Sequence, residues 1–313
     1  MRSFTTRVLL FALSAAALAG CSKNPTIQIP PPPAPRLFVA DNLNGLLAYN
    51  QPLSSTSMPS LTVASLAGAG GVTTDKSGNL YVSEAFTNQV FIYAPGFTAT
   101  STPIATVGPI VGAGQIIGIT VDSNGGLYVA DDLAGKVFYF APPVGGTMPT
   151  TTMTSASFTQ PAGVALDNAG HLLVANFGVQ MNIVILSPPF LNGVNVATGV
   201  MTLPAQGVGI ETSVSGNLLA CMNDGRIGVI KPPFATGVTP SFYIPAPVIN
   251  GAPANEAFDP TYDAVGNLYV PYGDHGGPNA GVGVFAPSFN ASSVPTYTFS
   301  GGMTFPTGAA FAQ

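Results

Sequence analysis

A short hydrophobic phrase recurs six times along this chain, most often as Leu-Tyr-Val-Ala. The copies are Leu37–Ala40, Leu80–Ser83, Leu127–Ala130, Leu172–Ala175, Leu218–Cys221 and Leu268–Pro271. Successive copies begin 43, 47, 45, 46 and 50 residues apart. A strand-like repeat with a period near 45 residues is typical of β-propellers, which use one four-stranded blade per repeat. The sequence therefore predicts an all-β fold, a six-bladed β-propeller, over residues 37–313.

Tight turns and prolines frame the phrase in the same order in most repeats. The turn before the phrase begins with Asp or Ser and has Gly as its fourth residue: Asp75–Gly78, Asp122–Gly125, Asp167–Gly170, Ser213–Gly216 and Asp263–Gly266. Asp and Ser accept hydrogen bonds from turn amides, so we interpret these side chains as turn residues. Prolines that suit edge strands precede the predicted outer strands: Pro59, Pro103, Pro149, Pro240 and Pro295.

The two ends of the predicted propeller complete one another. The C-terminal Pro306–Phe311 matches Pro161–Leu166, which begins an inner strand, while the first blade begins at Leu37 with a second strand. The last segment is therefore predicted to pair with the N-terminal blade as its inner strand. This pairing would close the ring and remove two exposed strand edges.

Residues 1–20 have the features of a secretory signal. Arg2 and Arg7 form a positive start, and Val8 to Leu18 is an apolar run too short for a stable membrane span. The run ends in Leu18-Ala19-Gly20-Cys21, which resembles a bacterial lipobox. The resemblance implies cleavage before Cys21, acyl chains such as palmitate on that cysteine, and an envelope lipoprotein anchored to the membrane through lipid. An ordinary secretory signal with a chance cysteine is the alternative.

The next segment, residues 21–36, has the composition of a tether. Its prolines, Pro30–Pro33 and Pro35, favour extended polyproline II. Ser22, rather than Asp, follows the cysteine, and by the usual bacterial sorting pattern this favours the outer membrane.

Charge is scarce and mostly negative. The chain has 8 Lys and Arg against 13 Asp and Glu, and Arg2 and Arg7 would leave with the signal. An acidic surface argues against nucleic acid as a partner. We expect the protein to be a monomer.

The repeat as a whole, Pro-x-Gly-Val-x-x-Asp-x-x-Gly-x-Leu-Tyr-Val-Ala-Asp, resembles the NHL-repeat family. It is also similar to the gluconolactonase-like and virginiamycin B lyase-like propellers of the wider TolB-like superfamily. The resemblance covers nearly all of the chain from Leu37 onward. It implies the fold, but that superfamily contains lactonases, lyases and many non-catalytic scaffolds. Its basic residue before the third strand survives here only as Lys136 and Arg226.

Polar residues follow the first four copies of the phrase, and blade symmetry places them in a ring at one mouth of the channel. They are Asp41, Glu84, Asp131 and Asn176, whereas Met222 and Tyr272 follow the last two copies. Oxygen ligands in a ring suit a hard cation such as Ca²⁺, so the ring is a candidate ligand-binding site, with Asp131 and Asn176 as candidate metal ligands. Alternatively, these side chains cap their strands by accepting hydrogen bonds from loop amides.

Four further residues have side chains that could take part in chemistry. Asp274 and His275 lie in a long sixth-blade loop, where Asp274 could orient His275 as a catalytic base. His171 occupies a turn position held by Asn79, Gly126, Asn217 and Asn267 in other repeats, which predicts a turn role. Cys221 replaces the last residue of the phrase and is predicted to be a buried, unreactive thiol.

Two functions agree with these features. The scarcity of histidine and charge, the regular blades and the lipid tether favour a binding or scaffold module for a protein or glycan, without chemistry. The alternative is a metal-dependent hydrolase or lyase of the gluconolactonase or virginiamycin B lyase type, which would use the mouth ring with Asp274 and His275.

Overall fold

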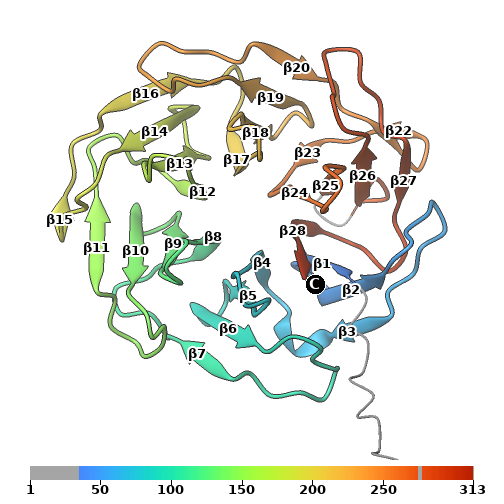
Figure 1. Ribbon diagram of the computed structural model, residues 1–313, viewed down its shortest axis with the longest axis horizontal. Coiled ribbons are helices and arrows are strands. Elements are labelled where there is room, and N and C mark those ends of the chain that lie inside the picture. The colour runs from blue at the N-terminus through green and yellow to red at the C-terminus, as the bar shows by residue number, and fades with distance from the viewer. Residues whose placement is uncertain (1–34, 274–276, 313) are drawn as a thin grey trace, which may run out of the picture. The chain divides into compact units, whose positions relative to one another are not determined.

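The computed structural model describes residues 35–273 and 277–312, and they form six antiparallel blades arranged in a ring (Figure 1). The signal peptide, residues 21–34 of the predicted tether, and Asp274 and His275 lie outside the described residues. Arg36, predicted as the end of the tether, is instead the first residue of a strand, because it pairs with Asn50 and Ala312. Within the described residues, no helix has the length and apolarity needed to cross a membrane.

The first three blades, each given from the channel outward, have these strands. Blade 1 consists of β28 (Pro306–Ala312), β1 (Arg36–Asp41), β2 (Gly45–Asn50) and β3 (Leu61–Val63), followed by the 3₁₀ helix η1 (Ala64–Leu66). Blade 2 consists of β4 (Ala69–Thr74), β5 (Leu80–Glu84), β6 (Gln89–Tyr93) and β7 (Ala105–Val107). Blade 3 consists of β8 (Ile116–Val121), β9 (Leu127–Asp131), β10 (Lys136–Phe140) and β11 (Thr151–Thr154), and β15 (Gly193–Val194) adds in parallel to β11.

The remaining blades repeat the plan with one departure. Blade 4 consists of β12 (Pro161–Leu166), β13 (Leu172–Asn176), β14 (Asn182–Leu186) and β16 (Gly199–Thr202). Blade 5 consists of β17 (Gly207–Thr212), β18 (Leu218–Met222), β19 (Ile227–Ile230) and β20 (Phe242–Ile244), and a hairpin of β21 (Val248–Ile249) and β22 (Ala252–Pro253) follows. Blade 6 has its inner edge divided between β23 (Glu256–Ala257) and β24 (Thr261–Tyr262), both paired with β25 (Leu268–Gly273), and continues with β26 (Gly281–Phe285) and β27 (Tyr297–Phe299). Asp259-Pro260 lies in the break, and proline has no amide to donate to a ladder.

The repeated phrase is the second strand of every blade. Its strands are buried on both faces, because each blade packs against a neighbour on either side. The buried side chains of the described residues form one hydrophobic cluster at each junction of adjacent blades. Burial on both faces explains why the phrase is a continuous apolar run rather than an alternating one.

Glycine allows the inner strands to approach one another around the channel. A Cβ on Gly118 would lie 2.2 Å from the Ala162 carbonyl oxygen of the next blade, and one on Gly71 would lie 2.8 Å from that of Ile117. Gly163, Gly209 and Gly308 hold the same position in their blades, and Asp259 replaces this glycine in blade 6.

The C-terminal strand lies innermost in blade 1. β28 pairs antiparallel with β1, from Arg36 opposite Ala312 to Asp41 opposite Pro306. The Ala309 amide also donates to the Asp259 carbonyl oxygen of blade 6, at 3.0 Å. The end of the chain thus bonds to the first and the last blade of the ring.

Candidate functional site

The four polar residues of the predicted mouth ring lie at equivalent positions, each at the end of its second strand, and all four are buried. Asp41 Oδ2 accepts from the Thr304 and Phe305 amides, which precede β28, at 2.7 and 3.0 Å. Asp131 accepts from the Gly114, Gln115 and Ala134 amides at 2.6, 3.1 and 2.7 Å. Each carboxylate also accepts from the loop that follows the second strand, so it joins that loop to the loop that precedes the inner strand, at one end of the blade.

The other members of the ring are bonded in related ways. Glu84 accepts from the Phe86 and Thr87 amides and from the Thr87 hydroxyl. Asn176 accepts from the Thr159 amide at 3.1 Å and donates to the Ser157 carbonyl oxygen at 2.9 Å. Met222 and Tyr272 are fully buried in the clusters between blades. Within the described residues, no group of three or more His, Cys, Asp or Glu could hold a metal ion. The proposed ligand and metal roles of the ring, including those of Asp131 and Asn176, stay predictions.

We predict that Asp131→Ala will lower the free energy of unfolding by about 3 kcal/mol, because three loop amides lose the buried, charged acceptor to which they donate. Denaturant unfolding of Asp131→Ala beside the exposed-site control Asn124→Ala measures this effect. Unchanged stability combined with the loss of a stoichiometric divalent ion would instead support the metal site at the mouth.

The predicted roles of two isolated residues are confirmed. The His171 amide and Nδ1 bond to Asp167 Oδ1 and Oδ2 at 2.8 and 2.7 Å, within the turn. Cys221 is buried and free, and burial raises the pKa of its thiol well above its ordinary value. A thiol that keeps its proton is a poor nucleophile.

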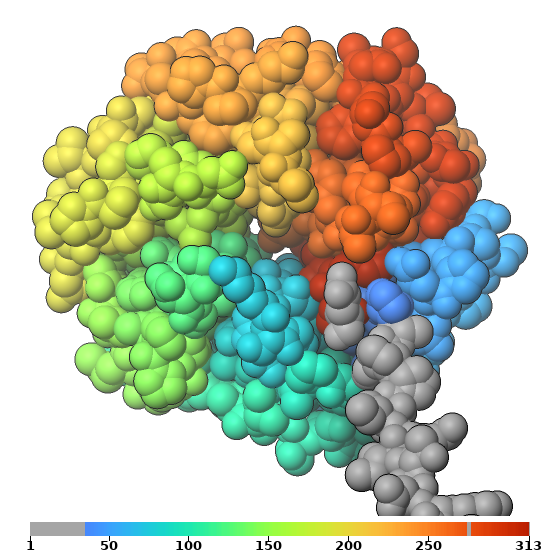
Figure 2. Space-filling model, in the orientation of Figure 1, coloured from blue at the N-terminus to red at the C-terminus, as the bar shows by residue number. Residues whose placement is uncertain are grey.

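Two carboxyl groups in the channel, Glu211 and Asp259, are not predicted from the sequence as site residues. Glu211 of β17 and Asp259 line a cavity of about 340 Å³ at the ends of the inner strands, together with five threonines, Thr73, Thr74, Thr120, Thr212 and Thr261. The Ile210 amide donates to Asp259 Oδ1 at 3.2 Å, and the Thr212 amide donates to Glu211 Oε1 at 3.0 Å. Figure 2 shows the opening at the centre of the ring.

Burial controls the protonation of this pair. It raises the pKa of Glu211 to about 7, although the Thr212 amide opposes the shift. Burial and the neighbouring Glu211 raise the pKa of Asp259 well above its ordinary value. The signal in the sequence is that Asp259 occupies the position where the other repeats have glycine.

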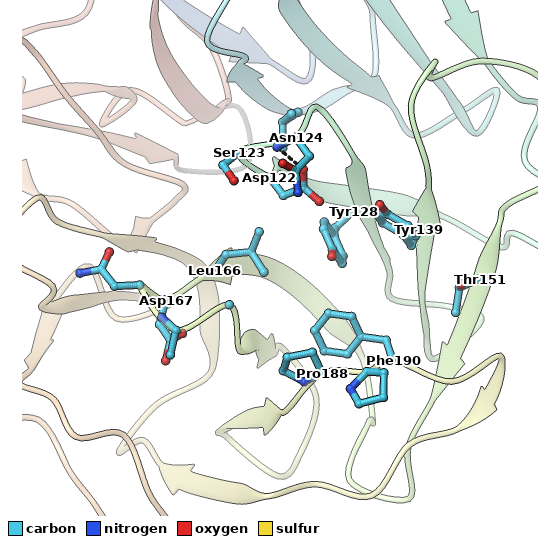
Figure 3. A pocket seen from close by; sticks show the side chains of 15 residues that line it. Asp122, Ser123, Asn124, Tyr128, Tyr139, Thr151, Leu166, Asp167, Pro188 and Phe190 are labelled. Carbon is cyan, nitrogen blue, oxygen red and sulfur yellow. Dashed lines mark hydrogen bonds between the residues drawn. The ribbon is translucent and has the colours of Figure 1, made fainter.

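A larger groove lies between blades 3 and 4, on the face of the first turns (Figure 3). Its volume is about 770 Å³, within the usual range for small-molecule sites. Tyr128, Tyr139 and Phe190 supply aromatic surface, and Asp122 and Asp167 lie on separate edges. We name this site the blade 3–4 groove. The rest of its lining consists of Val121, Ser123, Asn124, Thr151, Leu166, Asn168, Ala169, Gly170, Pro188 and Pro189.

Two residues distinguish blade 3 from the blades that it otherwise copies. In blade 2, Asn79 and Tyr81 both donate to Asp75 Oδ2, at 2.8 and 3.2 Å, and Ile92 lies opposite Tyr81. In blade 6, Asn267 and Tyr269 donate likewise to Asp263 Oδ2, at 2.7 and 3.1 Å, and Val284 lies opposite Tyr269.

In blade 3 the asparagine is replaced by Gly126, and the aliphatic residue by Tyr139. Asp122 Oδ1 still accepts from the Asn124 and Gly126 amides, at 2.8 and 2.9 Å, so the predicted turn role is confirmed. However, no hydrogen bond within residues 35–273 and 277–312 reaches Asp122 Oδ2 or the hydroxyls of Tyr128 and Tyr139. The blade 3–4 groove therefore contains Asp122 Oδ2 and the Tyr128 hydroxyl, whose equivalents in blades 2 and 6 bond to one another, and the Tyr139 hydroxyl, which those blades lack.

Comparisons with known proteins give the fold and no closer relationship. No family model matches the chain, and no curated protein does. A protein of unknown function from Bacteroides caccae is 10% identical over 90% of this chain and 99% of its own, with a TM-score of 0.63. A candidate 6-phosphogluconolactonase from Bacteroides fragilis is 13% identical over 84% of this chain and 81% of its own, with a TM-score of 0.58. A streptogramin B lyase is 16% identical over 73% of this chain and 68% of its own, with a TM-score of 0.50. The chain is a six-bladed β-propeller whose solved structural neighbours include lactonase-like and lyase-like propellers.

Proposed function

We propose that this protein is a non-catalytic binding module, and that its ligand occupies the blade 3–4 groove. The observation that carries the proposal is the difference between blade 3 and blades 2 and 6. The turn aspartate of blade 3 keeps one oxygen without a partner, beside two tyrosine hydroxyls that also have none among the described residues. Such polar atoms, in a groove beside partly buried aromatic rings, favour a bound ligand that can form hydrogen bonds with them.

The proposal includes the cellular location of the protein. The signal-like start and the lipobox-like Leu18–Cys21 support a lipid anchor at Cys21 and an envelope location, with the outer membrane favoured by Ser22. Incorporation of labelled palmitate in wild type, and its loss in Cys21→Ser, is the corresponding test.

We predict that Gly126→Asn will abolish ligand binding. A Cβ on Gly126 would lie 2.6 Å from both Asp122 Oδ2 and the Tyr139 hydroxyl, so the asparagine found in other blades would force these two side chains to shift and would fill this edge of the groove. A thermal-shift screen with a panel of neutral polyols, amines and carboxylic acids measures binding. Asn79→Ala, which changes the same turn position in blade 2, should bind as wild type does. A shift that persists unchanged in Gly126→Asn would place the ligand elsewhere.

The Glu211–Asp259 pair favours the alternative, a metal-dependent hydrolase or lyase that works in the channel. Two carboxyl groups in a threonine-lined cavity offer the oxygen atoms that a hard cation prefers. Stabilisation by Ca²⁺ or Zn²⁺ that disappears in Glu211→Gln would support this second function. The absence of any such stabilisation would support the binding module.

A further inference from the structure

We propose that the ligand class of the blade 3–4 groove is carbohydrate, with a sugar ring lying against Tyr139 and Phe190 and its hydroxyls bonded to Asp122. This inference rests on the proposed function and narrows it to one kind of ligand. Three properties of the groove lead to it: its aromatic surface, its charge and its unpaired polar atoms.

The aromatic surface is extensive and held in place by packing. Tyr128 and Tyr139 are tilted against one another with ring centroids 4.7 Å apart, and Phe190 meets Tyr128 edge-on at 6.0 Å. Tyr128 is buried, whereas Tyr139 and Phe190 are only partly buried. Partly buried rings that a buried ring supports give a ligand a preformed apolar face.

The negative charge of the groove argues against an anionic ligand. No Lys, Arg or His is among the described residues that line it, and Asp122 and Asp167 supply negative charge. A phosphate or carboxylate ligand would meet repulsion without a compensating cation. Asp167 has its carboxylate occupied by the Ala169 and His171 amides and the His171 ring, so Asp122 is the acceptor left for a ligand.

The unpaired atoms match the hydroxyl groups of a sugar. A carboxylate oxygen accepts from hydroxyl donors, and a tyrosine hydroxyl both donates and accepts. Burial and Asp122 raise the pKa of Tyr139, so its hydroxyl keeps its proton at neutral pH. Ser123, Asn124 and Asn168 extend the same chemistry along the rim. An apolar ring face bordered by hydroxyl, amide and carboxylate groups is complementary to a pyranose, which has C–H faces and an equatorial belt of hydroxyls.

The opposing class of ligand is a cationic amine, which Asp122 alone could attract. An amine would use the carboxylate but would leave both tyrosine hydroxyls without acceptors for their protons. We therefore favour the neutral sugar, and the amine becomes an outcome of the test.

The probes are glucose, galactose, mannose, N-acetylglucosamine and their β-1,4-linked and α-1,4-linked disaccharides, examined with the full chain by saturation-transfer difference NMR and calorimetry. We expect saturation of the sugar C–H protons for at least one probe. Tyr139→Ala should weaken that binding at least tenfold. Asp122→Asn, which keeps an acceptor for the turn amides, should weaken it about tenfold, because the sugar hydroxyls lose a charged acceptor. Asp75→Asn is the matched control in blade 2, where the second oxygen is already bonded internally, and it should bind as wild type does.

The possible results separate the two proposals. Sugar binding lost in Tyr139→Ala and kept in Asp75→Asn supports both. If no sugar binds, but an amine produces a thermal shift that Gly126→Asn removes, the carbohydrate inference is overturned and the binding function of the groove stands. If neither sugars nor the wider panel produce a shift sensitive to Gly126→Asn, both are overturned. Equal circular dichroism spectra and melting curves for wild type and each variant confirm that a loss of binding is not a loss of folding.

Discussion

Deleting Thr307 to Gln313 will leave a chain that no longer unfolds cooperatively. The deletion removes nearly all of β28, which forms the complete inner ladder of blade 1. It also removes the Ala309 amide bond to Asp259 of blade 6 and the Thr307 hydroxyl bond to the Ala69 carbonyl oxygen of blade 2, at 2.9 Å. One strand thus connects three blades, and its loss exposes a row of unpaired backbone groups on β1.

Urea unfolding followed by circular dichroism tests this expectation. Deletion of Gln313 alone is the control and should leave a sharp transition. Ala310→Asp keeps the full length but puts a carboxylate at a position that is 3% exposed, so it should destabilise without removing the ladder. A truncated protein with the melting behaviour of the full chain would contradict the role of β28 in closing the ring.

The blade order could be predicted from the sequence because its causes are local and repeated. The phrase has to be a buried second strand in all six copies, and the turn aspartates bond to amides only two to four residues away. The outer strands β3, β7, β11, β20 and β27 each begin two residues after one of the expected prolines. Proline prevents the ladder from extending further, so the edge strand begins just beyond it.

The candidate sites depended on contacts between blades, which the repeats do not encode. The sequence shows that Asp131 follows a strand, but not that Gly114 and Gln115 of the preceding loop turn their amides toward it. Glu211 and Asp259 lie 48 residues apart by number and meet only because adjacent blades converge on the channel. The sequence indicates these sites only where a residue departs from the repeat. Asp259 stands where the other blades have glycine, and Gly126 stands where blades 2 and 6 have asparagine.

The channel pair leads to a second large effect, a stability that falls as the pH rises toward 7. Burial raises the pKa of Glu211 from 4.5 to about 7, and that of Asp259 is raised as well. Between pH 4.5 and about 7, the ordinary and the raised pKa of Glu211, the folded protein binds more protons than the unfolded chain. The free energy of unfolding therefore decreases with increasing pH in this range. The contribution is fully present below about pH 4.5 and is lost as the pH passes through about 7.

Glu211→Gln should remove most of this dependence, because the amide cannot ionise and still accepts from the Thr212 amide. Relative to wild type, we expect little change at pH 4.5 and a gain of about 3 kcal/mol in the free energy of unfolding at pH 8. Asp224→Asn, at an exposed carboxylate paired with Arg226, is the control and should show no comparable gain. Parallel pH profiles for wild type and Glu211→Gln would mean that Glu211 ionises freely in the channel. If Glu211→Gln is more stable than wild type at pH 8 but not at pH 4.5, the ionisable Glu211–Asp259 pair lowers the stability of the wild-type protein at neutral pH. Such a destabilising pair is expected where the carboxyl groups have a role in the channel.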